Sequence, residues 1–201
     1  MSRTIKPLVF LFCLVPAGWL AFAVLTGRTS ANPAEDIILT TGIWALRFLL
    51  ATLTITPLRR LTGWHVLIKY RRMLGLFAFF YAVVHLASYI AFDRFFAFDE
   101  VLVDIAERPF ITAGMAAFGL MIPLAVTSTR GWIRTLGTRW QLLHRLVYVS
   151  AAAACLHFIW KVKVVVGEPV YYAVVLAILL GFRVAWRVRA AGAARRQPAR
   201  A

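Results

Sequence analysis

The sequence predicts an all-α integral membrane protein: a bundle of six transmembrane helices with the N-terminus and the C-terminus in the cytoplasm. Of its 201 residues, 62% are hydrophobic and the mean hydropathy is +0.78, whereas soluble domains are about 45–50% apolar. The apolar residues gather into six segments of about 20 residues, the length that crosses the hydrocarbon core of a bilayer. Short polar loops separate the segments, so the chain is expected to cross the membrane six times.

The first two spans are expected at about residues 7–26 and 37–56. Arg3 and Lys6 precede the first span, as they would in a signal peptide. Its apolar stretch is longer than the roughly 7–15 residues of a signal-peptide core, so we expect it to be retained as a helix. Pro57 is expected to end the second span.

The remaining four spans are expected at about residues 73–92, 110–127, 143–160 and 169–186. Proline and glycine mark their boundaries because neither residue continues a helix well. Arg108-Pro109 precedes the fourth span, and Gly167-Glu168-Pro169 precedes the sixth. Residues 187–201 are expected to form a basic cytoplasmic tail near anionic lipid. Residues 1–201 are therefore interpreted as one transmembrane domain, with no internal repeat.

The charged residues orient the bundle and exclude nucleic acid as the partner. The net charge is +15, but the basic residues lie in short loops between apolar runs and not on one soluble face. If the N-terminus is cytoplasmic, inner segments carry seventeen of the 23 Lys and Arg residues, and outer loops carry five. This distribution follows the positive-inside rule. All eight acidic residues then fall in the outer loops.

Two histidines lie in the outer halves of expected spans, where an ionisable ring is costly and indicates a functional site. His85 lies in the third span and His157 near the outer end of the fifth, so the two rings are at similar depth. If these helices are neighbours, the rings are expected to be the axial ligands of one haem b on the outer side of the bundle. The alternative is that each ring only forms hydrogen bonds between helices. The sequence has no CxxCH motif, so covalent haem attachment is not expected.

A third histidine, His144, precedes His157 by thirteen residues, so the rings share a helix face about 20 Å apart along the axis. A second haem at His144 would need a ligand at Arg71 or Arg72, but a guanidinium stays protonated. We therefore expect one haem, with His144, Arg71 and Arg72 contacting a second cofactor, a quinone or the haem propionates. The alternative for His144 is a residue at headgroup level. Arg47, near the middle of the second span, is expected to contact a cofactor carboxylate or a quinone, or else a polar pocket.

The outer loop over residues 93–108 is acidic and is a candidate docking surface for a basic patch on a soluble partner. Its acidic residues are Asp93, Asp99, Glu100, Asp104 and Glu107. An ordinary solvated loop has a similar composition, so both interpretations stay open here.

Two sequence motifs resemble a known family. Arg71–Gly75 leads to Tyr81–His85, and Leu143–Tyr148 leads to His157. With six spans around them, these motifs resemble the ferric-reductase-like transmembrane domain. The chain is more closely similar to the MsrQ (YedZ) family, the haem-binding membrane subunits of the periplasmic protein-methionine-sulfoxide reductase system.

The resemblance implies a multi-pass electron-transfer subunit of the bacterial inner membrane, and not the catalytic subunit. It implies that electrons come from the quinol pool or a cytosolic flavin reductase. They pass to a periplasmic, molybdopterin-containing methionine sulfoxide reductase catalytic subunit, which repairs oxidised periplasmic proteins. The implied cofactors are haem b and FMN. Two-haem eukaryotic relatives carry a histidine where this chain has Arg71 or Arg72, which favours one haem here.

Two other functions fit the same sequence. A proton- or solute-conducting membrane protein would use His85, His157 and Arg47 as relay residues. A structural membrane anchor would only recruit a soluble enzyme. Neither alternative requires a coloured cofactor, so the absorbance spectrum of the purified protein separates them from an electron-transfer subunit.

Overall fold

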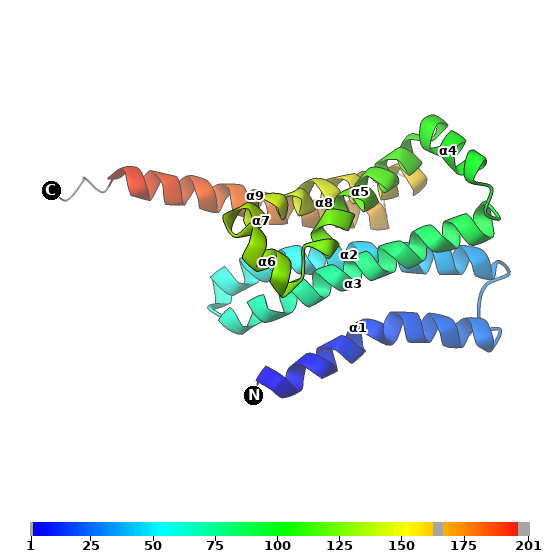
Figure 1. Cartoon of the computed structure of the whole chain (residues 1–201), viewed down its shortest axis with the longest axis horizontal. Coiled ribbons are helices and arrows are strands. Elements are labelled where there is room, and N and C mark those ends of the chain that lie inside the picture. The colour runs from blue at the N-terminus through cyan, green and yellow to red at the C-terminus, as the bar shows by residue number, and fades with distance from the viewer. Residues whose placement is uncertain (1, 163–166, 197–201) are drawn as a thin grey trace.

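The computed structural model describes residues 2–162 and 167–196, and the regular secondary structure of this part is entirely helical (Figure 1). Six helical segments of this part are long and apolar enough to cross a membrane. The long helices are α1 (Ser2–Leu25), α2 (Pro33–Thr62), α3 (Ile68–Ser88), α5 (Pro109–Val126), α8 (Leu146–Val162) and α9 (Glu168–Arg196). The prediction of an all-α bundle with six membrane-spanning helices is therefore confirmed.

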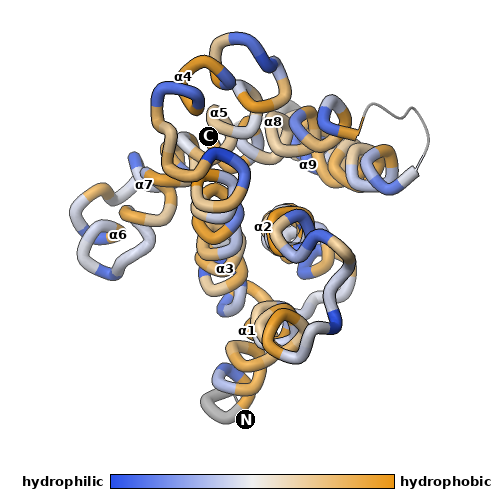
Figure 2. The backbone as a smooth tube through the Cα atoms, turned by 90° about the vertical axis from the view of Figure 1, so that its right-hand side faces the viewer, coloured by the Kyte–Doolittle hydropathy of each residue, from blue (hydrophilic) through white to orange (hydrophobic). Residues whose placement is uncertain are grey.

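Two helical hairpins form the centre of the bundle. α2 packs along α3, and α5 packs along α8, while α9 lies against α8 and α2. α1 contacts α2 and α3 and lies on the side of them away from α5 and α8 (Figure 2). Both termini lie at the same end of the bundle, which an even number of crossings requires (Figure 1).

Five short helical elements connect the long ones. They are the 3₁₀ turn η1 (His65–Leu67), the π turn η2 (Tyr89–Asp93), α4 (Phe98–Glu107), α6 (Arg130–Leu136) and α7 (Thr138–Leu143). Only loops were expected there, because these stretches are too short or too polar to cross a membrane. His144 lies at the junction of α7 and α8, inside the apolar segment Thr138–Val162 that is long enough to cross a membrane.

Two long helices exceed their expected bounds. Pro57 does not end α2, which continues to Thr62 and closes at Gly63 with φ of +73°, a conformation that glycine adopts readily. The expected tail also differs, because its residues up to Arg196 continue α9 as helix. Alanine and arginine are strong helix formers, so the helix continues past the apolar stretch. Residues 197–201 of that tail lie outside the described part.

Arg183 of α9 compensates for Pro57. Proline has no amide hydrogen, so the carbonyl of Leu53, four residues earlier, receives no bond from the helix. The Arg183 side chain donates to this carbonyl from Nη2 at 2.6 Å, and from Nη1 to the carbonyl of Leu179 at 3.2 Å. Its guanidinium also lies 5.1 Å from the ring centroid of Tyr148. One cation, only 7% exposed, thus joins α9 to α2 and α8.

Tyr81 fastens α1 to the rest of the bundle. Its hydroxyl donates to the carbonyl of Cys13 at 2.9 Å and accepts from the amide of Ala17 at 3.1 Å. These groups flank Pro16, where the helix lacks an amide hydrogen. A polar group from a neighbouring helix often satisfies the backbone near a proline in a membrane, and here α3 provides it.

Candidate functional site

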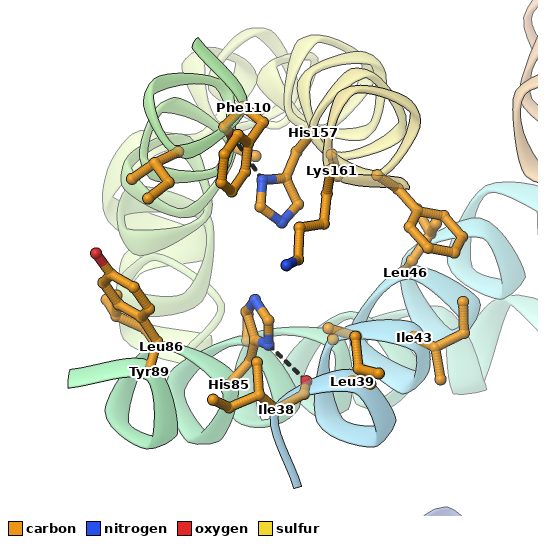
Figure 3. A pocket seen from close by; sticks show the side chains of 18 of the residues that line it. Ile38, Leu39, Ile43, Leu46, His85, Leu86, Tyr89, Phe110, His157 and Lys161 are labelled. Atoms are coloured by element: carbon orange, nitrogen blue, oxygen red, sulfur yellow. Dashed lines mark hydrogen bonds between the residues drawn. The ribbon is translucent and has the colours of Figure 1, made fainter. Parts of the chain in front are cut away.

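The two outer histidines face each other across a cavity between the two hairpins (Figure 3). His85 comes from α3 and His157 from α8. Their ring centroids are 6.1 Å apart and the ring planes cross at 77°. The cavity has a volume of about 960 Å³ and is lined mainly by apolar side chains, which places it at the large end of small-molecule sites. α3 and α8 meet across this space instead of packing along each other.

A backbone carbonyl orients each ring. His85 Nδ1 lies 2.8 Å from the carbonyl oxygen of Ile38, and His157 Nδ1 lies 2.6 Å from that of Phe110. A carbonyl oxygen only accepts, so Nδ1 must donate and therefore carries the proton. In the neutral ring Nε2 then has a free lone pair. Histidines that bind metals are typically held in this way through their other ring nitrogen.

Two glycines give the rings room. A Cβ atom at Gly42 would lie 2.9 Å from Cε1 and Nδ1 of His85. A Cβ atom at Gly114 would lie 2.7 Å from Nδ1 of His157. Because real Cβ atoms do not approach other atoms so closely, any side chain at these positions displaces the ring. The two helices that supply the carbonyls, α2 and α5, therefore also supply a gap for each imidazole.

The two half-sites form an internal repeat that the sequence analysis missed. Phe110, Gly114 and His157 stand 72 positions after Ile38, Gly42 and His85, respectively. The hairpin of α5 and α8 thus repeats the arrangement of the hairpin of α2 and α3. The expectation of no internal repeat is wrong at the level of structure. Few residues are shared at this interval, and only the glycine and histidine spacing signals it.

Arg47 lines the same cavity but has a partner from the protein. Its Nε donates to the hydroxyl of Tyr172 on α9 at 2.8 Å. Its guanidinium also lies 4.9 Å from the ring centroid of Trp44. The side chain faces the bundle interior, as expected for a charge within a span.

His144 lies outside this cavity, at the junction of α7 and α8. Its ring stacks on Trp140 with a centroid distance of 3.8 Å, and its Nδ1 lies 3.1 Å from the Trp140 carbonyl. Nε2 is buried and has no hydrogen-bond partner among the described residues. Arg71 lies near enough to His144 and Arg183 to repel positive charge on both. Arg72 is exposed and, within the described part, forms no ion pair.

Asp104 does not belong to the exposed acidic surface, because it is 5% exposed and paired twice. Its carboxylate lies 2.5 Å from Arg94 Nη2 and 3.0 Å from Arg108 Nε. The hydroxyl of Tyr89 also donates to it. This network joins α4 to the ends of α3 and α5. The sequence does not reveal this network, because the five acidic residues of the loop look equivalent there.

The network also holds a strained turn before α4. Phe95 and Phe96 have φ of +46° and +63°, which is unfavourable for residues other than glycine. Arg94, which precedes them, donates from Nε to the hydroxyl of Tyr89 at 3.2 Å. This bond, and then the charges of Asp104 and Asp93, raise the pKa of Arg94 above its usual range. The other four expected docking residues, Asp93, Asp99, Glu100 and Glu107, are exposed.

Comparison with known proteins places this geometry in a family. The family described as ferric reductase like transmembrane component matches residues 41–155. The chain belongs to this family. The match covers both repeated glycines and ends two residues before His157. No solved structure matches the chain.

Three relatives carry the name protein-methionine-sulfoxide reductase heme-binding subunit MsrQ. The protein from Herminiimonas arsenicoxydans is 51% identical over 185 residues, covering 90% of this chain and 85% of that protein. The one from Azospira oryzae is 49% identical over 190 residues, covering 94% and 82%. The one from Xanthomonas euvesicatoria is 50% identical over 188 residues, covering 90% and 86%. Within the ferric-reductase-like family, the chain thus belongs to the MsrQ family and is a multi-pass protein of the bacterial inner membrane.

Proposed function

We propose that the chain is the haem b-binding membrane subunit of a protein-methionine-sulfoxide reductase system. It delivers electrons from the quinol pool, or from a cytosolic flavin reductase, to a periplasmic molybdenum-dependent catalytic subunit. The observation that carries the proposal is the pair of facing imidazoles, His85 and His157, with ring centroids 6.1 Å apart. The names of the relatives, which describe a haem-binding subunit, support it.

The geometry fits one metal ion between the two rings. A metal–imidazole nitrogen bond is about 2.0–2.1 Å long. Two such bonds in line, together with the distance from each Nε2 to its ring centroid, give a centroid separation of roughly 6 Å. The 960 Å³ cavity provides space for the macrocycle around the metal. Haem bound there supplies a one-electron centre close to one face of the membrane.

The chain's own residues prepare this site. The carbonyls of Ile38 and Phe110 keep the protons on Nδ1, so both Nε2 atoms would have lone pairs available to hold a metal. Gly42 and Gly114 let the rings lie close to the helix backbones. The lining is mainly apolar, and ligand identity, hydrogen bonding and burial would set the redox potential of a bound haem.

His144 is the best-supported residue of a second site at the other end of the bundle. A buried Nε2 without a partner is costly in a membrane, and Arg71 provides a nearby positive charge. This pair would suit a quinone oxygen or the phosphate of FMN. Arg72 and Arg47 have weaker support, because Arg72 is exposed and Arg47 already binds Tyr172.

The exposed acidic residues around α4 form the proposed docking surface for the catalytic subunit. They are Asp93, Asp99, Glu100 and Glu107. We place both termini in the cytoplasm, as the positive-inside rule favours. On that orientation α4, at the end of the bundle away from the termini (Figure 1), faces the periplasm, and so does the cavity, which Asp93 and Arg108 line next to α4. An acidic surface steers a partner that carries a basic patch.

Optical spectra of the purified protein, expressed with haem precursor, test the proposal. Wild type should give Soret and α bands that change on reduction. His85→Ala and His157→Ala should each lose most of the bound haem. His144→Ala should keep it, and so should the matched control His65→Ala, which removes an exposed histidine. A colourless wild type, or equal haem loss in all four variants, would reject the assignment and favour a channel or an anchor.

A further inference from the structure

One cation points into the cavity beside the facing histidines. Lys161 lies one helical turn after His157 on α8, and its ammonium extends into the space near both imidazoles (Figure 3). Its Nζ is 5.8 Å from the ring centroid of Phe110. Within residues 2–162 and 167–196 it forms no ion pair and its side chain makes no hydrogen bond.

The other two cations that line the cavity are already bound to protein groups. Arg47 donates to Tyr172, and Arg108 pairs with Asp104 at 3.0 Å. Lys161 is therefore the cation of this cavity that has no hydrogen bond or ion pair with the described residues, whereas Arg47 binds a neutral hydroxyl. The carboxyl groups that line the cavity, those of Glu35, Asp93 and Glu168, form no ion pair with Lys161. Lys161 is an exposed residue near the end of α8, so its ammonium can have water beside it until an anionic ligand takes the place of that water.

The internal repeat singles out the same position. Tyr89 stands four residues after His85, as Lys161 stands four residues after His157. The Tyr89 hydroxyl donates to Asp104 and accepts from Arg94, so it is engaged away from the cavity centre. Of these two equivalent positions, only Lys161 presents a group that an anionic ligand can use.

We propose that Lys161 binds a propionate carboxylate of the haem held by His85 and His157, which turns the carboxylate-bearing edge toward the end of the bundle that carries α4. The inference rests on the proposed function. Haem carries its two carboxylates on one edge, and a carboxylate at membrane depth needs a cation. A lysine one turn beyond the ligand, on the same helix face, meets that requirement.

The charge of Lys161 should also act on the iron. A nearby positive charge disfavours the oxidised state, which carries one more positive charge than the reduced state. Replacing Lys161 with a neutral residue should therefore lower the midpoint potential. It should also speed haem loss, because a charge-assisted hydrogen bond is lost.

Haem release to excess apomyoglobin measures the contact directly. Lys161→Gln should release haem at least about tenfold faster than wild type, as expected for the loss of a hydrogen bond between charged groups. Lys161→Arg should restore most of the retention. Arg28→Gln is the matched control, because Arg28 lies in the loop before α2 and contacts Phe22; its release rate should equal that of wild type.

Reconstitution with haem dimethyl ester identifies the carboxylate as the partner. The ester should leave wild type faster than haem does, and the added effect should be much smaller in Lys161→Gln, because both changes remove one contact. Fully additive effects, or an unchanged release rate and potential in Lys161→Gln, would overturn the inference while leaving the histidine assignment intact. Failure of the proposed function is distinct: wild type would then bind no haem.

Discussion

The backbone of Gly114 lies directly against the ring of His157, so that a methyl group added to the glycine would come within 2.7 Å of Nδ1. That nitrogen is the one that donates to Phe110. Displacing the ring therefore breaks the bond that fixes its proton and moves Nε2 out of line with His85. Because Gly114 carries only a hydrogen atom in place of a side chain, the ring of His157 can lie in line with His85.

Gly114→Ala is expected to lose most of the bound haem, and Gly42→Ala to act in the same direction on the other ring. Gly119→Ala is the matched control, since nothing lies within 4 Å of a Cβ atom there. In a helix, glycine to alanine alone should stabilise by about 1 kcal/mol. Haem per chain, measured by absorbance, should therefore fall in the first two variants and stay at the wild-type value in the third. Full haem content in Gly114→Ala would show that the site tolerates a displaced ring.

Arg183→Met should destabilise the fold by about 1–3 kcal/mol, because it leaves the Leu53 carbonyl buried without a donor. In a Pro57→Ala background the same substitution should cost less, because residue 57 then donates to that carbonyl itself. Thermal unfolding in detergent measures the double-mutant cycle. Arg187→Met, an exposed arginine on the same helix, should change little. Equal costs in both backgrounds would mean that Arg183 acts by some route other than Leu53.

Asp104→Asn should release α4 while leaving the histidine pair in place. Removing one partner of a fully buried ion pair costs about 3–5 kcal/mol, and the cost here should be smaller because Arg94 and Arg108 are 16% and 48% exposed. The loss falls on the network that holds the strained turn at Phe95 and Phe96. Hydrogen exchange over residues 94–108 should become much faster, with haem content unchanged. Asp99→Asn, at an exposed acid of the same helix, should leave exchange as in wild type. Loss of haem together with α4 would contradict this separation.

Neutralising Asp99 and Glu107 together should slow association with the catalytic subunit severalfold at low salt, with little change in dissociation. Rim charges act mainly on the association rate, and salt screens them within roughly 8–10 Å. Binding kinetics at two ionic strengths measure the effect. Glu168→Gln, which removes an exposed acid at the start of α9, is the control. A salt-independent rate in wild type would exclude α4 as an electrostatic docking surface.

Hydropathy was sufficient to predict the six spans, because crossing a bilayer needs a continuous apolar segment. Histidine positions also predicted which two rings lie at the same depth, since helix rise converts numbering into distance. What the sequence did not reveal depends on contacts between helices. The carbonyls of Ile38 and Phe110 carry no signature of their own, because any residue supplies the same group.

The roles of the charged residues also depend on contacts between helices, so the sequence did not reveal them. In the sequence, Asp104 does not differ from the acidic residues near it. In the fold, Arg94 and Arg108, which lie on either side of α4, pair with it. Arg183 carried no signal at all, because its partner is a carbonyl exposed by a proline 126 positions earlier in the chain. Arg47 was correctly expected to face the interior, and the sequence did not reveal that its protein partner is the hydroxyl of Tyr172.

The 72-residue interval between the half-sites bears on how the protein is assembled. The first hairpin supplies one imidazole, one carbonyl and one glycine of the site. A ligand can be bound between two rings only after the second hairpin has been synthesised. A ligand bound by both rings would then hold the two hairpins together. In the protein without ligand, the two hairpins should therefore separate from each other before either hairpin unfolds.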